Sequence, residues 1–107
     1  MSDAAAIARL RAMVGGPRDG ALLRVSLATA LLAAGDMAAA LVELRQAVMF
    51  DPDYSAGWKL LGKTLADSGD AAGAIDAYRN GIAAASKRGD KQAQKEMTVY
   101  LKRLEKP

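Results

Sequence analysis

An internal repeat constrains this chain more than any other feature of its sequence. When the chain is shifted by 34 residues, residues 21–54 align with residues 55–88. Seven aligned positions hold the same residue: Leu27/Leu61, Leu31/Leu65, Gly35/Gly69, Asp36/Asp70, Ala38/Ala72, Ala40/Ala74 and Arg45/Arg79. A period of this length indicates one small structural unit that is used twice and that buries its core by stacking.

Each unit is predicted to hold two short helices. Leu27 and Leu31 are four residues apart, as are their counterparts in the second unit, so each pair shares one helix face. The helices are separated by a Gly-Asp step, in which the glycine can end one helix in the left-handed conformation and the aspartate can cap the next. After the first unit, Pro52 stops the helix, and Asp53 or Ser55 is expected to cap the helix that follows.

Composition limits the functions that this repeat can carry. The 107 residues suffice for one compact domain, and the apolar half of them is rich in alanine, as in closely packed helices. With no cysteine and no histidine, the chain lacks a disulfide, a thiolate ligand and the commonest general base. We therefore expect no metal, no cofactor and no catalysis. No apolar run approaches a membrane span, so a cytoplasmic protein is expected.

The second unit resembles a tetratricopeptide repeat (TPR), a 34-residue helix-turn-helix family. The matching positions are Trp58, Leu61, Gly62, Leu65, Gly69, Ala74, Tyr78 and Gly81, preceded by Pro52. The first unit matches at Leu27, Ala28, Leu31, Ala40, Leu44, Ala47 and Pro52. It carries Arg24 in place of the tryptophan, and the second unit ends in Ser86 where the family usually has proline. The resemblance implies an all-α fold of about six helices, with antiparallel helix pairs stacked in a right-handed superhelix.

We expect the flanking segments to cap the two repeats within a single domain spanning residues 1–107. Upstream, residues 3–14 resemble the second helix of a truncated unit. Repeat 1 then covers residues 21–54 and repeat 2 covers residues 55–88. Downstream, residues 90–106 form an amphipathic helix that closes the other end. Its apolar stripe consists of Ala93, Met97, Tyr100, Leu101 and Leu104.

The resemblance also implies a binding groove for a protein or peptide, lined by the first helix of each unit. The residues expected to face the groove are Leu22, Val25, Thr29, Leu32, Ala56, Lys59, Lys63 and Ala66. Lys59 and Lys63 are four residues apart, which favours an acidic segment or a chain-terminal carboxylate as the ligand, whereas two solvated lysines are the plainer interpretation. One subfamily of these repeats binds the carboxyl end of chaperone tails through a set of Lys, Asn and Arg residues. That set is largely absent from this chain. Val25, Thr29 and Leu60 replace three of its members.

Two other functions stay open beside that of a protein-binding adaptor. The stack could associate with a second copy of itself as a homodimer, with Leu22, Val25 and Leu32 buried between the chains. Nucleic-acid contact is the third option, because residues 87–107 hold seven basic and three acidic side chains, a net charge of +4. The interleaved acids, and the place of Tyr100 on the apolar stripe, argue against it.

Overall fold

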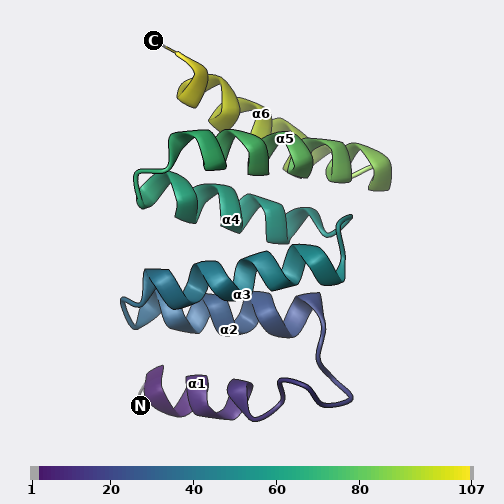
Figure 1. Cartoon of the computed structure of the whole chain (residues 1–107). Coiled ribbons are helices and arrows are strands. Elements are labelled where there is room, and N and C mark those ends of the chain that lie inside the picture. The colour runs from purple at the N-terminus through teal and green to yellow at the C-terminus, as the bar shows by residue number, and fades with distance from the viewer. Residues whose placement is uncertain (1–2, 107) are drawn as a thin grey trace. The chain divides into compact units, whose positions relative to one another are not determined.

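The computed structural model describes residues 3–106, and this range contains six α-helices and no strand (Figure 1). The helices are α1 (Asp3–Arg11), α2 (Ala21–Ala33), α3 (Met37–Phe50), α4 (Ser55–Asp67), α5 (Ala71–Arg88) and α6 (Lys91–Glu105). The expected all-α fold class with six helices is confirmed. The chain divides into two compact units between Asp51 and Pro52, so that α1–α3 form the first unit and α4–α6 the second.

The two predicted Gly-Asp corners are confirmed. Gly35 and Gly69 have φ angles of 82° and 89°, in the left-handed region that a side chain would disfavour. Asp36 and Asp70 each accept a hydrogen bond from the backbone N–H three residues further on, at 3.1 and 2.8 Å. This bond satisfies one of the free N–H groups at the start of a helix.

A third corner of the same kind joins α5 to α6, and the comparison at a shift of 34 residues did not reveal it. Gly89 has a φ angle of 73°, and the Asp90 carboxylate accepts a hydrogen bond from the Ala93 N–H at 3.1 Å. Because Ser86 replaces the usual proline, α5 continues to Arg88 and ends only at this glycine. The signal was present in the sequence as a third Gly-Asp dipeptide.

The predicted cap of α4 was wrong. The residue at the cap is Tyr54, and no side chain caps the helix there. Ser55 is already the first helical residue, and Asp53 lies one position before the cap. Asp53 instead forms an ion pair with Lys87 at 2.9 Å.

The N-terminal helix is shorter than the expected range of residues 3–14. After Arg11 the chain continues in tighter turns, because the N–H groups of Met13 and Val14 bond to carbonyls three residues back, at 3.0 and 3.1 Å. Gly15, with a φ angle of 84°, then turns the chain away. The turns shorten the capping helix and lead into the loop that precedes α2.

The core of the first unit lies between α2 and α3, and α1 packs against α2. Its side chains are the apolar residues that the repeat pattern predicted. Those with no exposed surface are Leu27, Ala28, Ala40, Leu44 and Ala47. Alanines at three of these positions let the two helices approach closely, and the leucines fill the remaining space.

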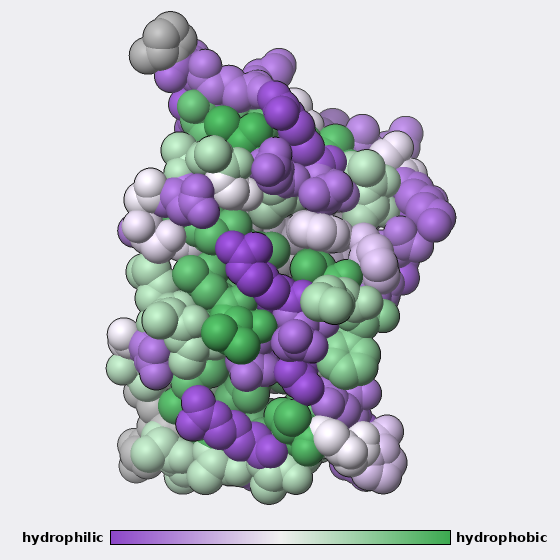
Figure 2. Space-filling view, in the orientation of Figure 1, coloured by the Kyte–Doolittle hydropathy of each residue, from purple (hydrophilic) through white to green (hydrophobic). Residues whose placement is uncertain are grey.

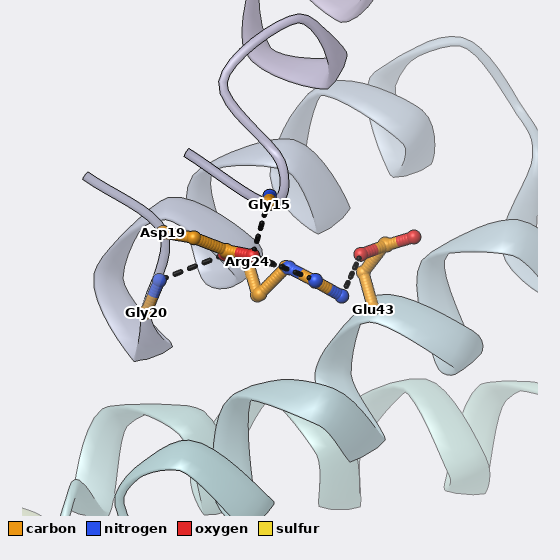
Figure 3. A network of polar contacts seen from close by, with 5 residues as sticks. All are labelled: Gly15, Asp19, Gly20, Arg24 and Glu43. Atoms are coloured by element: carbon orange, nitrogen blue, oxygen red, sulfur yellow. Dashed lines mark hydrogen bonds and ion pairs between the residues drawn. The ribbon is translucent and has the colours of Figure 1, made fainter. Parts of the chain in front are cut away.

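Arg24 ties the first unit to the loop before it (Figure 3). Its guanidinium donates to both carboxylate oxygens of Asp19 at 2.9 Å and to Glu43 on α3 at 3.1 Å. The ring of Phe50 lies 5.4 Å from the guanidinium carbon. The hydrogen bond from Arg24, together with the backbone N–H groups of Gly15 and Gly20, holds the pKa of the Asp19 carboxyl well below its usual range.

The core of the second unit depends on two glycines. A Cβ atom at Gly62 would lie 2.5 Å from the ring of Tyr78, and one at Gly81 would meet both the Met97 sulfur and the Cβ of Trp58. The missing side chains therefore allow large residues to fill the space between helices. The stripe predicted for α6 is confirmed, because Ala93 and Met97 are buried and Tyr100, Leu101 and Leu104 are half-buried.

Within residues 3–106, no helix combines the length and the apolar character that a membrane crossing requires.

Candidate functional site

The four predicted binding residues of the second unit lie along one face of α4. Ala56 is exposed, and Ala66 is half-buried. Lys59 forms an ion pair with Glu96 of α6 at 2.9 Å, and Lys63 forms one with Asp67 at 2.9 Å. Each lysine thus has a carboxylate of its own. An anion shared between the two lysines is no longer needed to explain their spacing.

The four predicted residues of the first unit lie along α2. Leu22 is 69 % exposed, whereas Val25 and Leu32 are half-buried. Thr29 is exposed, and its hydroxyl donates to the Val25 carbonyl at 2.9 Å. Figure 2 shows apolar residues at the surface over α2 and α3, among hydrophilic ones. Three of these four residues are apolar, which suits contact with another apolar surface.

A cleft of about 270 Å³ opens in the second unit among α4, α5 and α6. It contains two of the residues predicted from the sequence, Lys63 and Ala66. The full lining consists of Lys63, Ala66, Asp67, Tyr78, Tyr100, Arg103 and Leu104. The other five were not predicted, because they come from the far end of α4 and from two further helices, which only the fold brings together.

Two tyrosines form the floor of the cleft. The rings of Tyr78 and Tyr100 are tilted by 46° with their centroids 5.6 Å apart, a favourable aromatic arrangement. Gly62 allows the Tyr78 ring to lie directly against α4. Burial raises the pKa of the Tyr78 hydroxyl, and the neighbouring Tyr100 adds to that effect. The hydroxyl therefore stays protonated and able to donate a hydrogen bond at neutral pH.

The Tyr78 hydroxyl has no hydrogen-bond partner among the described residues, although Tyr78 is only 4 % exposed. Within residues 3–106 no fully buried side-chain oxygen lacks a partner, so this hydroxyl must reach the surface, and the surface it lines is the cleft. Arg103 likewise forms no ion pair with any residue that the structure describes. The cleft thus combines an apolar floor with two unused donors.

Comparison with known proteins agrees with this architecture. No family model matches the chain. It is 50 % identical over 97 residues to a TPR repeat-containing protein of Pseudomonas aeruginosa, covering 91 % of this chain and 92 % of that protein. A protein of Bordetella parapertussis with a known solution structure is 48 % identical, with a TM-score of 0.75 over 92 % of this chain and 85 % of its own. The Sgt2 TPR domain of Aspergillus fumigatus is 27 % identical, with a TM-score of 0.65 over 98 % and 80 %.

Paired helices with glycine corners at a 34-residue period define a helical-repeat protein. The chain belongs to the tetratricopeptide repeat family, since half of the 97 aligned residues are identical to those of the Pseudomonas protein and the alignment covers nearly the whole of both chains. Members of this family are in general protein-interaction modules without catalytic activity. The expected family is therefore confirmed.

Proposed function

We propose that this chain is a non-catalytic adaptor that holds a segment of a partner protein along α4 and in the adjoining cleft. One observation carries the proposal: Lys63 and Ala66, predicted as binding residues from the sequence, line a cleft floored by tyrosines. Concave sites that combine apolar rings with a few polar groups are the usual places for recognition. The sequence-based prediction that the α2 residues Leu22, Val25, Thr29 and Leu32 also line the groove stays untested, and this proposal is confined to α4 and the cleft.

The proposal is tested by affinity capture with a charge-reversal variant, Lys59→Glu/Lys63→Glu. The repeat offers a matched control, because Val25 and Thr29 occupy the same repeat positions on α2. We expect the α4 variant to lose the partner and Val25→Glu/Thr29→Glu to keep it. Circular dichroism must show equal helix content in all three proteins. Equal capture by both variants and the wild type would contradict binding along α4.

Self-association is the second candidate, and exposed apolar residues of the first unit favour it. Val42 and Met49 are seven residues apart on α3 and are 59 % and 73 % exposed. The variant Val42→Lys/Met49→Lys should convert a dimer to a monomer in light scattering if this face joins two copies. A wild-type monomer at about 100 μM would rule out this candidate, because stable interfaces hold well below that concentration.

A further inference from the structure

We propose that the cleft of the second unit recognises a peptide segment in which one acidic side chain adjoins one apolar side chain. This inference rests on the proposed function and specifies the chemistry of the partner. It follows from the size of the cleft, from its floor and from the balance of charge along its rim.

The size of the cleft limits its occupant to a short segment. Sites for small ligands typically measure about 300–1,000 Å³. The cleft, at about 270 Å³, lies just below that range, with room for roughly two side chains.

The floor of the cleft suits one apolar side chain. Tyr78, Tyr100, Leu104 and Ala66 present rings and methyl groups to it. Burial of an apolar side chain against such a surface removes it from water at little cost, because the Tyr78 ring is already packed against α4 at Gly62 and against the Tyr100 ring.

The rim of the cleft suits a single negative charge. Lys63 is already paired with Asp67, whereas Arg103 has no ion pair within the described part of the chain. The lining therefore carries two cations and one anion, a net charge of +1 that complements one carboxylate better than a phosphate dianion or a nucleic-acid backbone. Arg103 can hold that carboxylate with two parallel hydrogen bonds, and the Tyr78 hydroxyl provides a further donor.

The apolar and the charged parts of the cleft lie close together. Tyr100 and Arg103 are three residues apart on α6, which places their Cβ atoms roughly 5–6 Å from each other. Two side chains of a bound segment can span such a distance, one on the rings and one on Arg103. We assign the carboxylate to an internal acidic residue, and a free C-terminal carboxylate is the alternative that the test separates.

The test is a titration of the ¹⁵N-labelled full chain, followed by NMR, with three synthetic peptides. The first is acetyl-Gly-Ser-Phe-Glu-Ser-Gly-amide, the second has Gln in place of Glu, and the third, acetyl-Gly-Ser-Gly-Phe, ends in a free carboxylate. We expect the Glu peptide to shift the signals of Arg103, Tyr100 and Leu104 and to bind about five-fold tighter than the Gln peptide, the gain of a partly exposed charge pair. Tighter binding of the third peptide would overturn the assignment to a side chain.

Variants distinguish a specific contact from general charge attraction. Arg103→Gln should abolish the preference for Glu over Gln, and Arg103→Lys should retain part of it. Arg79→Gln is the matched control, since Arg79 belongs to the same unit and is paired with Glu105 at 2.6 Å outside the cleft. Equal affinity for Glu and Gln peptides, or no binding of either, would overturn the inference. A captured partner that is lost by Lys59→Glu/Lys63→Glu but fully retained by Arg103→Gln would overturn it while leaving the proposed function intact.

Discussion

The two repeat units solve the same structural problem with different chemistry at one position. Arg24 and Trp58 occupy equivalent places, 34 residues apart. Each side chain donates a hydrogen bond back to the loop before its helix: Arg24 to Asp19 at 2.9 Å, and Trp58 to the Pro52 carbonyl at 2.7 Å. Both side chains at this position thus donate a hydrogen bond that ties the helix to the preceding loop. The donor is charged in the first unit and neutral in the second.

The residues that surround Arg24 and Trp58 differ accordingly. Arg24 is accompanied by Glu43 on the second helix of its unit, whereas the position equivalent to Glu43 is Ala77 in the other unit. A charged anchor needs a second carboxylate, since a partly buried guanidinium is stable only when its donors are used. The indole ring needs only apolar neighbours and one acceptor. Arg24 is thus paired with carboxylates inside its own unit, whereas Arg103 of the second unit forms no ion pair within the described residues.

A second difference concerns the sizes of two facing residues. The first unit has a buried Ala28 and a buried Leu44 where the second unit has Gly62 and Tyr78, which lie against each other. The gain of a ring on one helix is compensated by the loss of a methyl group on the other, because core volume is conserved. The exchange places an aromatic ring in the second unit, where it forms part of the cleft floor.

The largest effects are expected from the matched core leucines. Leu31 and Leu65 are 2 % and 3 % exposed in their respective units. Replacement of either by alanine should lower the free energy of unfolding by about 3 kcal/mol, since both the transfer energy and a cavity contribute. Urea denaturation measures the change. A cost below about 1 kcal/mol for one of them would show that the two cores are not equivalent.

The pair Gly62/Tyr78 should respond strongly to a single methyl group. Gly62→Ala is expected to cost about 2 kcal/mol because the added Cβ would meet the Tyr78 ring. Introduction of the first unit's pair, Gly62→Ala/Tyr78→Leu, should recover more than half of that loss. Thermal melts of the single and double variants test this expectation. If the loss of stability in the double variant equals the sum of the losses in the single variants, the two residues do not compensate each other in size.

Arg24→Met should lower Tm by about 4–8 °C, because Asp19 and Glu43 lose their common donor. Arg24→Lys keeps the charge but not the forked geometry, and we expect an intermediate melting temperature. If Arg24→Met melts at the same temperature as the wild type, the ion pairs are not what anchors α2 to its loop.

The Asp19 network should make stability depend on pH. The pKa of the Asp19 carboxyl is lowered in the folded state. The carboxylate therefore stabilises the fold at pH values above the unfolded-state pKa of about 3.9, and this contribution is lost as the pH falls below that value. Melting temperatures from pH 7 to pH 2.5 should therefore fall more steeply for the wild type than for Asp19→Asn. Parallel curves for the two proteins would show that the Asp19 carboxylate is not the source of the pH dependence.

The smallest effect is expected from loss of the ion pair between Lys87 and Asp53. Asp53 occupies the position in the second unit that is equivalent to Asp19 in the first. The Lys87 side chain is 70 % exposed, and exposed pairs contribute little. Lys87→Ala should change the free energy of unfolding by less than about 0.5 kcal/mol. A larger loss in urea denaturation would mean that Asp53 anchors its unit as Asp19 does.

Most of the fold could be predicted from the sequence because local rules determine it. The spacing of Leu27 and Leu31 indicates a helix face, and glycine before aspartate indicates a corner. The cap of α4 could not be predicted, since a shift of one residue decides which side chain can reach a free N–H group. The role of Arg24 was also missed, because its partners Asp19 and Glu43 come from a loop and a different helix.

The candidate site could be predicted only in part for a similar reason. Lys63 and Ala66 follow from the family pattern along one helix. Tyr100 and Arg103 do not, because α6 departs from the repeat register and its placement against α5 depends on Met97 fitting over Gly81. Contacts between helices outside the repeat are properties of packing and leave no periodic signal in the sequence.

The most direct test of this account is an amide chemical-shift map of the full chain bound to the partner segment obtained by capture. Because binding is proposed in the second unit, the largest changes should fall on the α4 and α6 residues Lys59, Lys63, Ala66, Tyr100 and Arg103. Changes concentrated instead on the α2 residues Leu22, Val25, Thr29 and Leu32 would contradict it.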